Sequence, residues 1–512
     1  MARFIIAHRL AGRQSGASKE QSRAAVENVV AGVRAFADVS AQPSVSPPRH
    51  RGMRVIDADA HEIKSKVHSF PENVIVEPEM VRVPARFFSA AAVRVDPSVM
   101  PASTGATFHL NAQCGETALR KAQVVLTLTN LRTYAGSTVA AQTDESGAVN
   151  LPYDPGFWAP TSVIVIPASG AWSWLGLAAG REMKLNLPGL PKTGPLGWWH
   201  HVLNQQSYSD KNGNGIRIGM ADTGVSQHPY LDHVQRIGAF VNGGHDASAN
   251  STEDISDHGT HVAGIIGARP REGSGDFAGI APGADLFCAR VYGPSPGHGA
   301  FPQPESANNG DVAIAIDALV NEHRVDLINL SLGGLQSSQV ELDAIQAALE
   351  AGVLVICSAG NESGGPVTYP AAYAQCVSVS AVGIPGCCPD NGLDAATTPA
   401  QSDRYSFTGL YSPTFVSVGP AINYVGPGVA IISTVPGASD GSAPYAAMSG
   451  TSMAAPAVCA ALATVLSRDQ TYLAMPRDIH RAARAATLLF QSCRDLGLSP
   501  QYQGLGLPGA LP

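Results

Sequence analysis

The chain is poor in charged residues and has no long apolar run. Asp, Glu, Lys and Arg make up only 14% of its 512 residues, whereas 45% are hydrophobic. This composition excludes a charge-rich disordered protein and allows large buried cores. No stretch approaches the roughly 18 apolar residues of a membrane helix, and the amino-terminal MARFIIAHRLAGRQ lacks the apolar length of a secretory signal. We therefore expect no membrane partner. We also expect a protein that is cytoplasmic or exported by a non-classical route, or extracellular if the start is misassigned.

Signatures of metal and nucleic-acid binding are also missing. The eight cysteines show no CxxC or Cys/His ligand spacing and no HExxH occurs, so we expect no metal site. Lys and Arg outnumber Asp and Glu over residues 1–194 (20 against 15), and the balance reverses over residues 195–512 (13 against 26). Neither part has the concentrated basic charge of a nucleic-acid-binding protein. The opposite signs fit docking of one part on the other, and chance composition explains them equally well.

The first 197 residues divide into two small units and a linker. Residues 1–88 alternate predicted strands (3–10, 53–58 and 73–83) with predicted helices (19–37 and 61–68), which indicates a small α+β domain. Residues 89–186 contain segments of period-two hydrophobicity separated by turn residues (TFHLNA, AQVVLTLTNL, STVAAQT, AVNLPYD and TSVIVIP). That pattern is typical of a small antiparallel β-sandwich. A linker rich in Pro and Gly covers residues 187–197.

Residues 198–512 have the pattern of an α/β domain. Apolar runs with the length of buried parallel strands (IRIGMA, ADLFCARV, DLINLSL, GVLVICSA and CVSVSAV) are separated by helical stretches such as 311–324 and 339–351. We predict a doubly wound, mostly parallel sheet.

Three segments of this domain carry residues suited to catalysis, although each has an ordinary structural explanation by itself. Asp222 (MADTG) follows a buried strand, where parallel sheets build their sites, but an Asp before a Gly is usually a turn former. His258 (DHGTHVAG) lies one helical turn before His261, so a metal-binding pair is an alternative. Ser452 (SGTSMAAP) opens a helix, where a serine is ordinarily an N-cap. The small residues before it leave room for a substrate backbone, and the helix start supplies a free amide.

Together these three residues meet the chemical requirement for acyl transfer. The Ser452 hydroxyl becomes a nucleophile when a base such as His258 takes its proton, and a carboxylate such as Asp222 holds the imidazole in one tautomer. The order Asp, His, Ser is the one found in subtilisin, and no GxSxG surrounds the serine. A lipase or esterase is therefore disfavoured.

ADTGV, HGTHVAG and GTSMAAP resemble the three catalytic signatures of the subtilase family, within a similarity that spans roughly residues 198–470. The resemblance implies a serine endopeptidase with an acyl-enzyme on Ser452, a polypeptide substrate and no cofactor in the chemistry. SAGN resembles the oxyanion-hole segment, which implies that the Asn361 side chain and the Ser452 amide bind the oxyanion. The implied substrate-binding residues are Ser331, Leu332, Gly333, Ala359 and Thr368.

The N-terminal unit is similar to the subtilase propeptide, a ferredoxin-like inhibitor and folding chaperone. The resemblance implies that residues 1–88 are an intramolecular partner whose last strand leads toward the active-site cleft. The β-sandwich resembles carboxypeptidase-regulatory or Ig-like modules. Self-cleavage has three alternatives: near residue 85, within the 187–197 linker, or nowhere. The linker is favoured because its Pro/Gly-rich sequence is expected to be exposed.

Some features depart from the family pattern. The loop 269–276 lacks the Asn-rich sequence of the usual calcium loop, so structural calcium is not supported there, and the long segment 385–404 has no assigned role. We expect cleavage after large apolar residues, while Glu362 leaves a preference for basic residues open. The alternative to an active endopeptidase is a catalytically silent or narrowly triggered subtilase that acts as a binding module.

Overall fold

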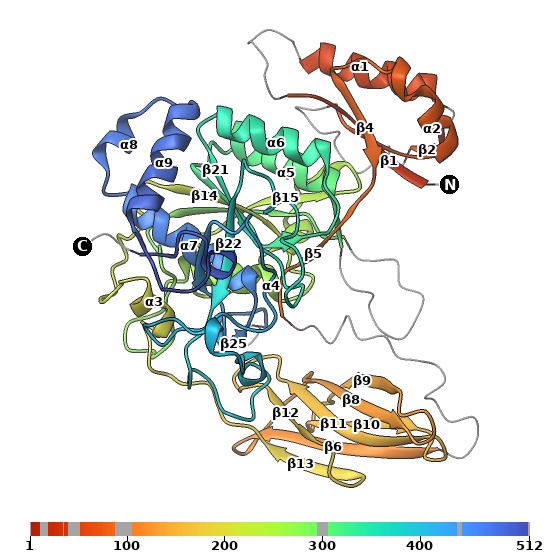
Figure 1. Ribbon diagram of the computed structural model, residues 1–512, viewed down its shortest axis with the longest axis vertical. Coiled ribbons are helices and arrows are strands. Elements are labelled where there is room, and N and C mark those ends of the chain that lie inside the picture. Colours follow the sequence, from red (N-terminus) through yellow and green to blue (C-terminus); the bar gives the residue numbers. More distant parts are fainter. Residues whose placement is uncertain are drawn as a thin grey trace.

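The computed structural model describes residues 2–10, 19–33, 35–38, 52–87, 105–293, 306–437 and 443–509. Three units follow one another along the chain: an N-terminal α+β unit, a β-sandwich and a large α/β domain (Figure 1). The N-terminal unit and the sandwich lie at different ends of the α/β domain. Among the described residues, every helix is too short or too polar to cross a membrane.

The N-terminal unit is a four-stranded antiparallel sheet covered by two helices. Its strand order is β2-β3-β1-β4, which with the βαββαβ element order is the ferredoxin-like arrangement. The predicted helix over 19–37 is too long, because the helix ends at Gly32 and residues 35–38 form an edge strand. Apolar residues continue across this boundary, so hydrophobicity alone did not separate the two elements. The elements are β1 (Ala2–His8), α1 (Lys19–Gly32), β2 (Ala35–Asp38), β3 (Arg54–Ala58), α2 (Ala60–Lys66) and β4 (Val74–Pro78).

The predicted strand over 73–83 is two strands that belong to different sheets. β4 completes the N-terminal sheet, whereas β5 (Val81–Pro84) leaves it and runs into the α/β domain (Figure 1). There β5 forms a three-stranded sheet with β18 (Ala307–Asn308) and β20 (Leu332–Gly333). The N-terminal unit is therefore connected to the α/β domain by backbone hydrogen bonds as well as by the chain.

The β-sandwich packs two sheets, β10-β6-β13 with β7 at one end of β6, and β12-β11-β8-β9, around one apolar core. The expectation of a purely antiparallel sandwich is wrong at one edge, because β13 pairs with β6 in parallel after the chain crosses over from β12 in the other sheet. The sequence does not predict β12 and β13, because neither strand contains a fully buried residue. The strands are β6 (Ala106–Cys114), β7 (Thr117–Ala118), β8 (Gln123–Asn130), β9 (Gly136–Gln142), β10 (Ala148–Tyr153), β11 (Trp158–Ile166), β12 (Trp174–Leu177) and β13 (Glu182–Asn186).

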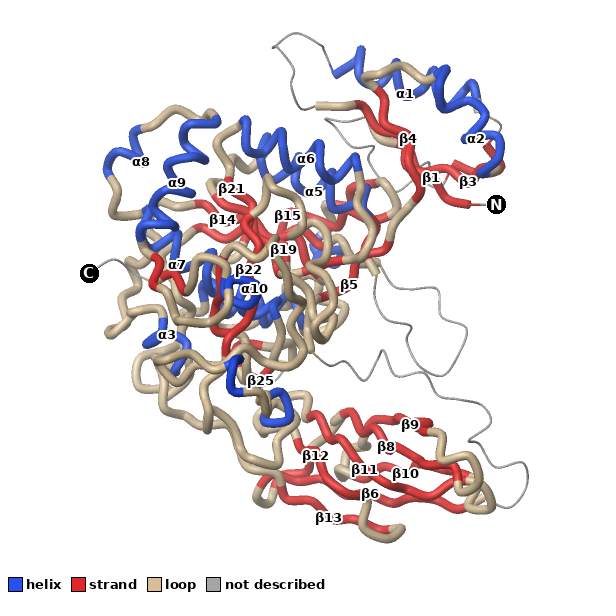
Figure 2. The backbone as a smooth tube through the Cα atoms, viewed as in Figure 1, coloured by secondary structure: helices blue, strands red, loops and turns tan. Residues whose placement is uncertain are grey.

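The α/β domain is built on an eight-stranded sheet of order β16-β15-β17-β14-β19-β21-β22-β23. Every pair is parallel except β15 with β16 at one edge, so the predicted mostly parallel sheet is confirmed. Helices lie on both faces (Figure 2), and two large apolar clusters share the buried side chains between them. The strands are β14 (Arg217–Asp222), β15 (Gln235–Val241), β16 (Gly244–Asp246), β17 (Asp285–Arg290), β19 (Leu327–Leu330), β21 (Leu354–Ser358), β22 (Val377–Val382) and β23 (Tyr424–Pro427).

Four of the helices pack in pairs: α4 (His258–Gly267) with α7 (Thr451–Leu466), and α5 (Asn309–Asn321) with α6 (Gln339–Glu350). The residues of the first pair belong to one apolar cluster and those of the second pair to the other, as expected for opposite faces of the sheet. The remaining elements are α3 (Trp198–Val202), β24 (Ile431–Thr434), β25 (Tyr445–Met448), α8 (Gln470–Ala474), α9 (Ile479–Gln491), β26 (Cys493–Arg494), α10 (Pro500–Gln503) and β27 (Leu507–Pro508).

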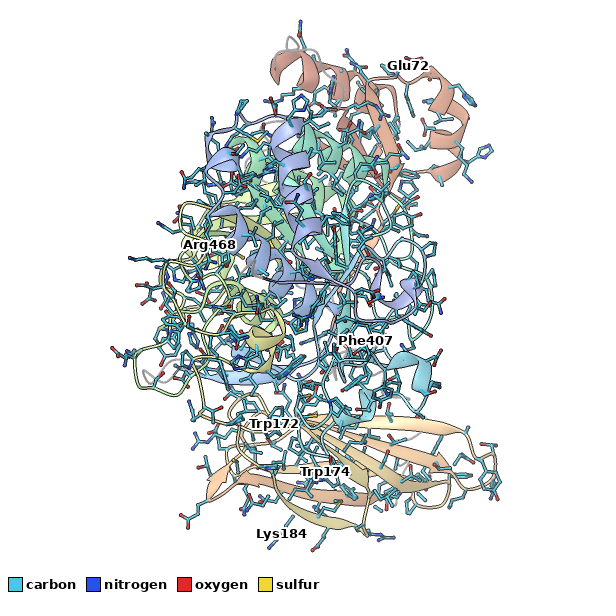
Figure 3. The ribbon with its side chains drawn as sticks, turned by 60° about the vertical axis from the view of Figure 1, so that its left-hand side comes forward. Glu72, Trp172, Trp174, Lys184, Phe407 and Arg468 are labelled. Atoms are coloured by element: carbon cyan, nitrogen blue, oxygen red, sulfur yellow. The ribbon has the colours of Figure 1, made fainter. Side chains whose placement is uncertain are left out.

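The sandwich contacts the α/β domain through the segment between β11 and β12. Trp172 packs in the α/β core while Trp174 packs against the sandwich core, and both lie where the two units meet (Figure 3). Between them the Ser173 hydroxyl donates to Asp394 Oδ2 at 3.2 Å, and the Leu393 amide donates to Ser173 Oγ at 3.2 Å. The long segment 385–404 thus holds the sandwich in place.

Candidate active site

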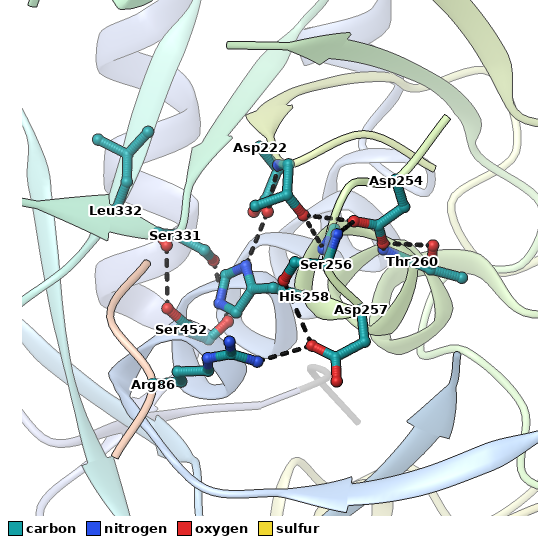
Figure 4. A network of polar contacts seen from close by, with 12 residues as sticks. Arg86, Asp222, Asp254, Ser256, Asp257, His258, Thr260, Ser331, Leu332 and Ser452 are labelled. Atoms are coloured by element: carbon teal, nitrogen blue, oxygen red, sulfur yellow. Dashed lines mark hydrogen bonds and ion pairs between the residues drawn. The ribbon is translucent and has the colours of Figure 1, made fainter. Parts of the chain in front are cut away.

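Asp222, His258 and Ser452 come from three different elements and meet on one side of the sheet. Asp222 is the last residue of β14, His258 is the first residue of α4, and Ser452 is the second residue of α7. The carboxyl ends of parallel strands face the starts of the following helices, which is where open α/β sheets place their sites. All three side chains are buried, and Figure 4 shows the His258 ring between Asp222 and Ser452.

A short hydrogen bond orients the His258 ring. Nδ1 of His258 lies 2.7 Å from Oδ1 of Asp222, and the same oxygen accepts the Thr223 amide at 2.7 Å. Thr223 extends the network, because its hydroxyl accepts the Gly259 amide at 2.8 Å and donates to Asp254 at 2.7 Å. This arrangement favours the tautomer with the proton on Nδ1, which leaves Nε2 unprotonated.

Asp254 extends this network by linking Thr223 to Thr260. Its Oδ2 accepts the amide of Thr260 at 2.8 Å and the hydroxyl of Thr260 at 2.6 Å (Figure 4). Burial raises the pKa of Asp254 to about 6, and the hydrogen bonds from Thr260 and Thr223 oppose that rise. Asp254 was not singled out from the sequence, although it stands four residues before His258.

The Ser452 hydroxyl does not hydrogen-bond to His258 in this structure. Its Oγ donates to the backbone oxygen of Ser331 at 2.9 Å, and among the described residues Nε2 of His258 has no hydrogen-bond partner. The Ser452 hydroxyl and the His258 ring are neighbours in Figure 4, and no hydrogen bond joins them there. Such loose contacts are common before a substrate is fully engaged.

Asn361 lies beside the start of α7. Its Oδ1 accepts the amide of Thr451 at 3.1 Å and the Thr451 hydroxyl at 3.0 Å. These contacts fix the amide group and leave its Nδ2 as a buried donor without a partner among the described residues. A buried donor without a partner can donate a hydrogen bond to an oxygen on which negative charge develops.

The chain itself occupies the cleft next to these residues. β5 pairs antiparallel with β20, with Val83 opposite Gly333 and Pro84 opposite Leu332. The next residue, Ala85, donates its amide to Ser331 O at 3.3 Å, and its carbonyl oxygen accepts the Ser452 amide at 3.0 Å. Two residues further, the Phe87 amide donates to Ser449 O at 2.7 Å. Residues 81–87, which we call the cleft segment, therefore run past Ser452 in extended contact with the domain.

The close approach of the cleft segment explains why a glycine, Gly450, stands two residues before Ser452. A Cβ on Gly450 would lie 2.5 Å from the Ala85 oxygen and 2.8 Å from the Arg86 Cα. Both distances are well inside normal van der Waals contact. The space predicted from the small residues of SGTS is thus filled by backbone.

The residues predicted to bind substrate lie along the cleft segment or next to the strand that pairs with it. Ser331, Leu332 and Gly333 make the backbone contacts described above, and Thr368 lies against the glycines of both walls. A Cβ on Gly333 would be 2.3 Å from Thr368 Oγ1, and one on Gly360 would be 2.7 Å from either terminal atom of that side chain. Thr368 is held there by a hydrogen bond from its hydroxyl to Ala359 O at 3.3 Å. The Thr368 side chain thus fills the space beside Gly333 and Gly360.

Beyond Ala85 the cleft segment is held by one acidic and one aromatic side chain. Arg86 Nη1 lies 2.6 Å from Oδ1 of Asp257, the neighbour of His258 (Figure 4), and the Phe87 ring stacks on Phe415 with centroids 5.1 Å apart. Arg86 and Phe87 border a cavity of about 240 Å³ whose far wall is formed by Lys121 and other residues of the β-sandwich. The sandwich therefore forms part of the cleft.

His261 does not form a metal-binding pair with His258. Its Nε2 lies 3.0 Å from Ile431 O and 3.1 Å from Ala446 O, and burial lowers its pKa to about 4. It is a neutral donor that ties α4 to β24 and β25. Within the described ranges, no group of three or more His, Cys, Asp or Glu side chains is placed to hold a metal ion. In the loop 269–276, Asp276 pairs with Lys192 and accepts the Tyr230 hydroxyl at 2.7 Å.

Comparison with known proteins shows the family of the chain. The family model described as "Subtilase family" matches residues 213–502. The chain is 32% identical over 262 residues to subtilisin Savinase of Lederbergia lenta, covering 51% of this chain and 79% of that protein. It is 32% identical over 299 residues to subtilisin E of Bacillus subtilis (strain 168), covering 57% and 65%. An alkaline protease of Shouchella clausii is 32% identical over 262 residues, and the match spans only 56% of its length. The chain belongs to the subtilase family.

Proposed function

We propose that the protein is a serine endopeptidase that cleaves polypeptides through an acyl-enzyme on Ser452. Family membership and the similarity to subtilisins support serine endopeptidase activity. The observation that carries the proposed site is the cleft segment, which pairs with β20 and presents the Ala85 carbonyl oxygen to the Ser452 amide at 3.0 Å. A peptide bond thus lies beside the proposed nucleophile in the orientation of a substrate.

In the proposed reaction the Ser452 Oγ attacks the carbonyl carbon, and Nε2 of His258 takes the hydroxyl proton. Asp222 holds the ring and stabilises the imidazolium. The Ser452 amide and Nδ2 of Asn361 bind the oxyanion. Collapse of the intermediate breaks the C–N bond, and His258 gives its proton to the departing amine. Water then hydrolyses the ester by the same proton path, so this chemistry needs no cofactor.

In the intact chain the proposed scissile bond is Ala85–Arg86, and residues 1–88 contribute an intramolecular inhibitor-like partner. The linker over 187–197, which the sequence favoured for cleavage, hydrogen-bonds to the α/β domain instead. The Gly194 amide donates to Gly275 O at 2.8 Å, and Pro195 O accepts the Ala278 amide at 2.9 Å. Cleavage at the proposed bond would leave a protein that begins at Arg86 and retains the β-sandwich.

Two measurements on the full chain test the proposal. A fluorophosphonate probe should label the processed wild type and neither Ser452→Ala nor His258→Ala, because losing either residue of such a triad costs on the order of 10⁶ in kcat. N-terminal sequencing should find Arg86 as a new terminus in the wild type only. Equal labelling of all three proteins would contradict the assigned roles. An intact wild-type chain would contradict the proposed scissile bond.

A silent binding module is the second candidate. It is favoured by the occupied cleft and by the contact of Ser452 Oγ with Ser331 O rather than with His258. In that case the wild type would remain intact and unlabelled, like Ser452→Ala.

A further inference from the structure

Arg82 of the cleft segment is the largest side chain of the described residues that is fully buried. Its neighbours on β5 point the other way, since Val81 is 58% exposed and Val83 is 44% exposed. This alternation is expected for a strand lying on a surface. Counting back from the proposed scissile bond, with Ala85 first, Arg82 is the fourth residue. The domain therefore surrounds one side chain at a defined distance from Ser452.

The pocket that receives Arg82 contains a carboxylate. Nε and Nη2 of Arg82 donate to the two oxygens of Glu341 at 3.1 and 2.9 Å, and both side chains have no exposed surface. Nη2 also donates to Gln336 O at 3.0 Å. A Cβ on Gly334 would lie 2.9 Å from Nη1, so that glycine gives the guanidinium its space. The guanidinium and the carboxylate form a bidentate ion pair, which an ammonium group cannot form.

We propose that Glu341 is a specificity-determining residue that selects polypeptides with arginine as the fourth residue before the cleaved bond. This inference rests on the proposed function and names its substrate class. The cleft segment, with the sequence Arg82-Val83-Pro84-Ala85, is then the first example of that class. Glu362, which the sequence suggested for a basic preference, is exposed and does not contact Arg82.

A second set of contacts argues that Arg82 is not needed merely to dock the N-terminal unit. Glu77 of β4 accepts the Ser338 hydroxyl at 2.6 Å and the Gln339 amide at 2.7 Å at the start of α6. Glu77 also accepts the Asn309 side-chain amide at 2.8 Å. These contacts bind the unit to the domain outside the cleft. A free peptide substrate has no such anchor, so the Glu341 pocket is the part of this interface that it can use.

The energetic reason for selection is the unpaired carboxylate. A peptide with a neutral residue at the fourth position would bury Glu341 without a cation, or would leave the pocket unfilled. Removing one partner of a buried ion pair at an interface lowers affinity by roughly 30-fold to more than 1000-fold. We expect discrimination in that range in kcat/KM.

The test uses the wild-type chain after self-processing and four chromogenic peptides. These are acetyl-Val-Arg-Val-Pro-Ala-p-nitroanilide and its analogues with citrulline, lysine or glutamine in place of arginine. The wild type should prefer arginine over citrulline, its neutral isostere, by at least about 30-fold in kcat/KM, with lysine between the two. Glu341→Gln should bring arginine and citrulline within a few-fold of each other. Glu362→Gln is the control, because it removes an exposed carboxylate that does not contact Arg82, and it should keep the wild-type preference.

The outcomes separate the two proposals. If the wild type cleaves all four peptides equally while Ser452 is labelled by the fluorophosphonate, the pocket assignment is wrong and the endopeptidase stands. If Glu362→Gln loses the preference and Glu341→Gln keeps it, the assignment is also wrong. If no peptide is cleaved and Ser452 is not labelled, the proposed function fails and the pocket assignment fails with it. The wild-type peptide series needs no variant, so the inference can be refuted even if Glu341→Gln does not fold.

Discussion

Gly450 offers the most direct test of the position of the cleft segment. In Gly450→Ala the new Cβ would lie 2.5 Å from the Ala85 oxygen and 2.8 Å from the Arg86 Cα, where about 3.5 Å is comfortable for carbon. The Ala85 oxygen cannot move away without losing its 3.0 Å bond to the Ser452 amide. The peptide must therefore shift by about 1 Å, and a displacement of that size costs about 100-fold in rate.

Gly450→Ala should accordingly slow the appearance of the Arg86 terminus, followed by N-terminal sequencing over time, by about 100-fold or more. The matched control is Gly419→Ala. Gly419 has a φ of 143°, similar to the 157° of Gly450, but a Cβ there meets nothing within 4 Å. The control includes the backbone strain without the clash and should process nearly as the wild type does. Wild-type processing by Gly450→Ala would refute the placement of residues 85–86, and equal slowing of both variants would show that strain alone is responsible.

Three further predictions concern the pocket, the pH dependence of stability and the sandwich contact. Thr368→Gly should open the space beside Gly333 and Gly360 and raise kcat/KM for a Phe-p-nitroanilide peptide relative to its Ala counterpart by roughly 10- to 200-fold; an unchanged ratio would exclude Thr368 from the substrate-binding residues. Burial lowers the pKa of His261 from 6.5 to about 4. Between these two pH values the unfolded chain binds a proton that the folded chain does not. The free energy of unfolding therefore falls as the pH drops from 6.5 to about 4, by up to about 3 kcal/mol from this residue. The test is urea unfolding at pH 7.5, 5.5 and 4.5 in a Ser452→Ala background. The free energy of unfolding should fall less with acid in the His261→Gln variant than in the protein that keeps His261. Equal losses in the two proteins would show that His261 is not the source of the acid dependence. Ser173→Ala removes both hydrogen bonds to residues 393–394 and should lower the free energy of unfolding by roughly 1–3 kcal/mol in the same urea assay, with no change if the sandwich is held elsewhere.

The sequence indicated Asp222, His258, Asn361 and Ser452 because each stands in a short motif, and all four lie together in the structure. Glu341 carried no comparable signal. An acidic residue in the first turn of a helix is ordinary, since it favours the positive end of the helix dipole. Its partner Arg82 is 259 positions away in the chain. Long-range pairing of this kind is decided by tertiary contacts that local patterns do not contain.

The sequence predicts the fold correctly where the buried strands are long. It does not separate two neighbouring elements where apolar residues continue from one element into the next. The parallel sheet was predicted because its strands are continuous apolar runs. The division of residues 73–83 into β4 and β5 was missed, because the residues on both sides of Pro78 are strand formers. What distinguishes β5 is its partner β20, which is remote in sequence. The linker was favoured as the cleavage point for a different reason, its Pro/Gly-rich composition, whereas the segment that lies beside Ser452 is the one that follows β5.

The contacts of Arg86 with Asp257 and of Phe87 with Phe415 have a consequence for the kinetics of the proposed self-cleavage. The departing amine belongs to the same polypeptide as the enzyme and is retained beside the acyl-enzyme by these contacts. A tethered amine has an effective concentration far above that of a free product. It therefore competes with water for the ester and can reform the Ala85–Arg86 bond. On the proposed mechanism, release of the new terminus from Asp257 and Phe415, rather than the first acylation, sets the point at which cleavage becomes irreversible.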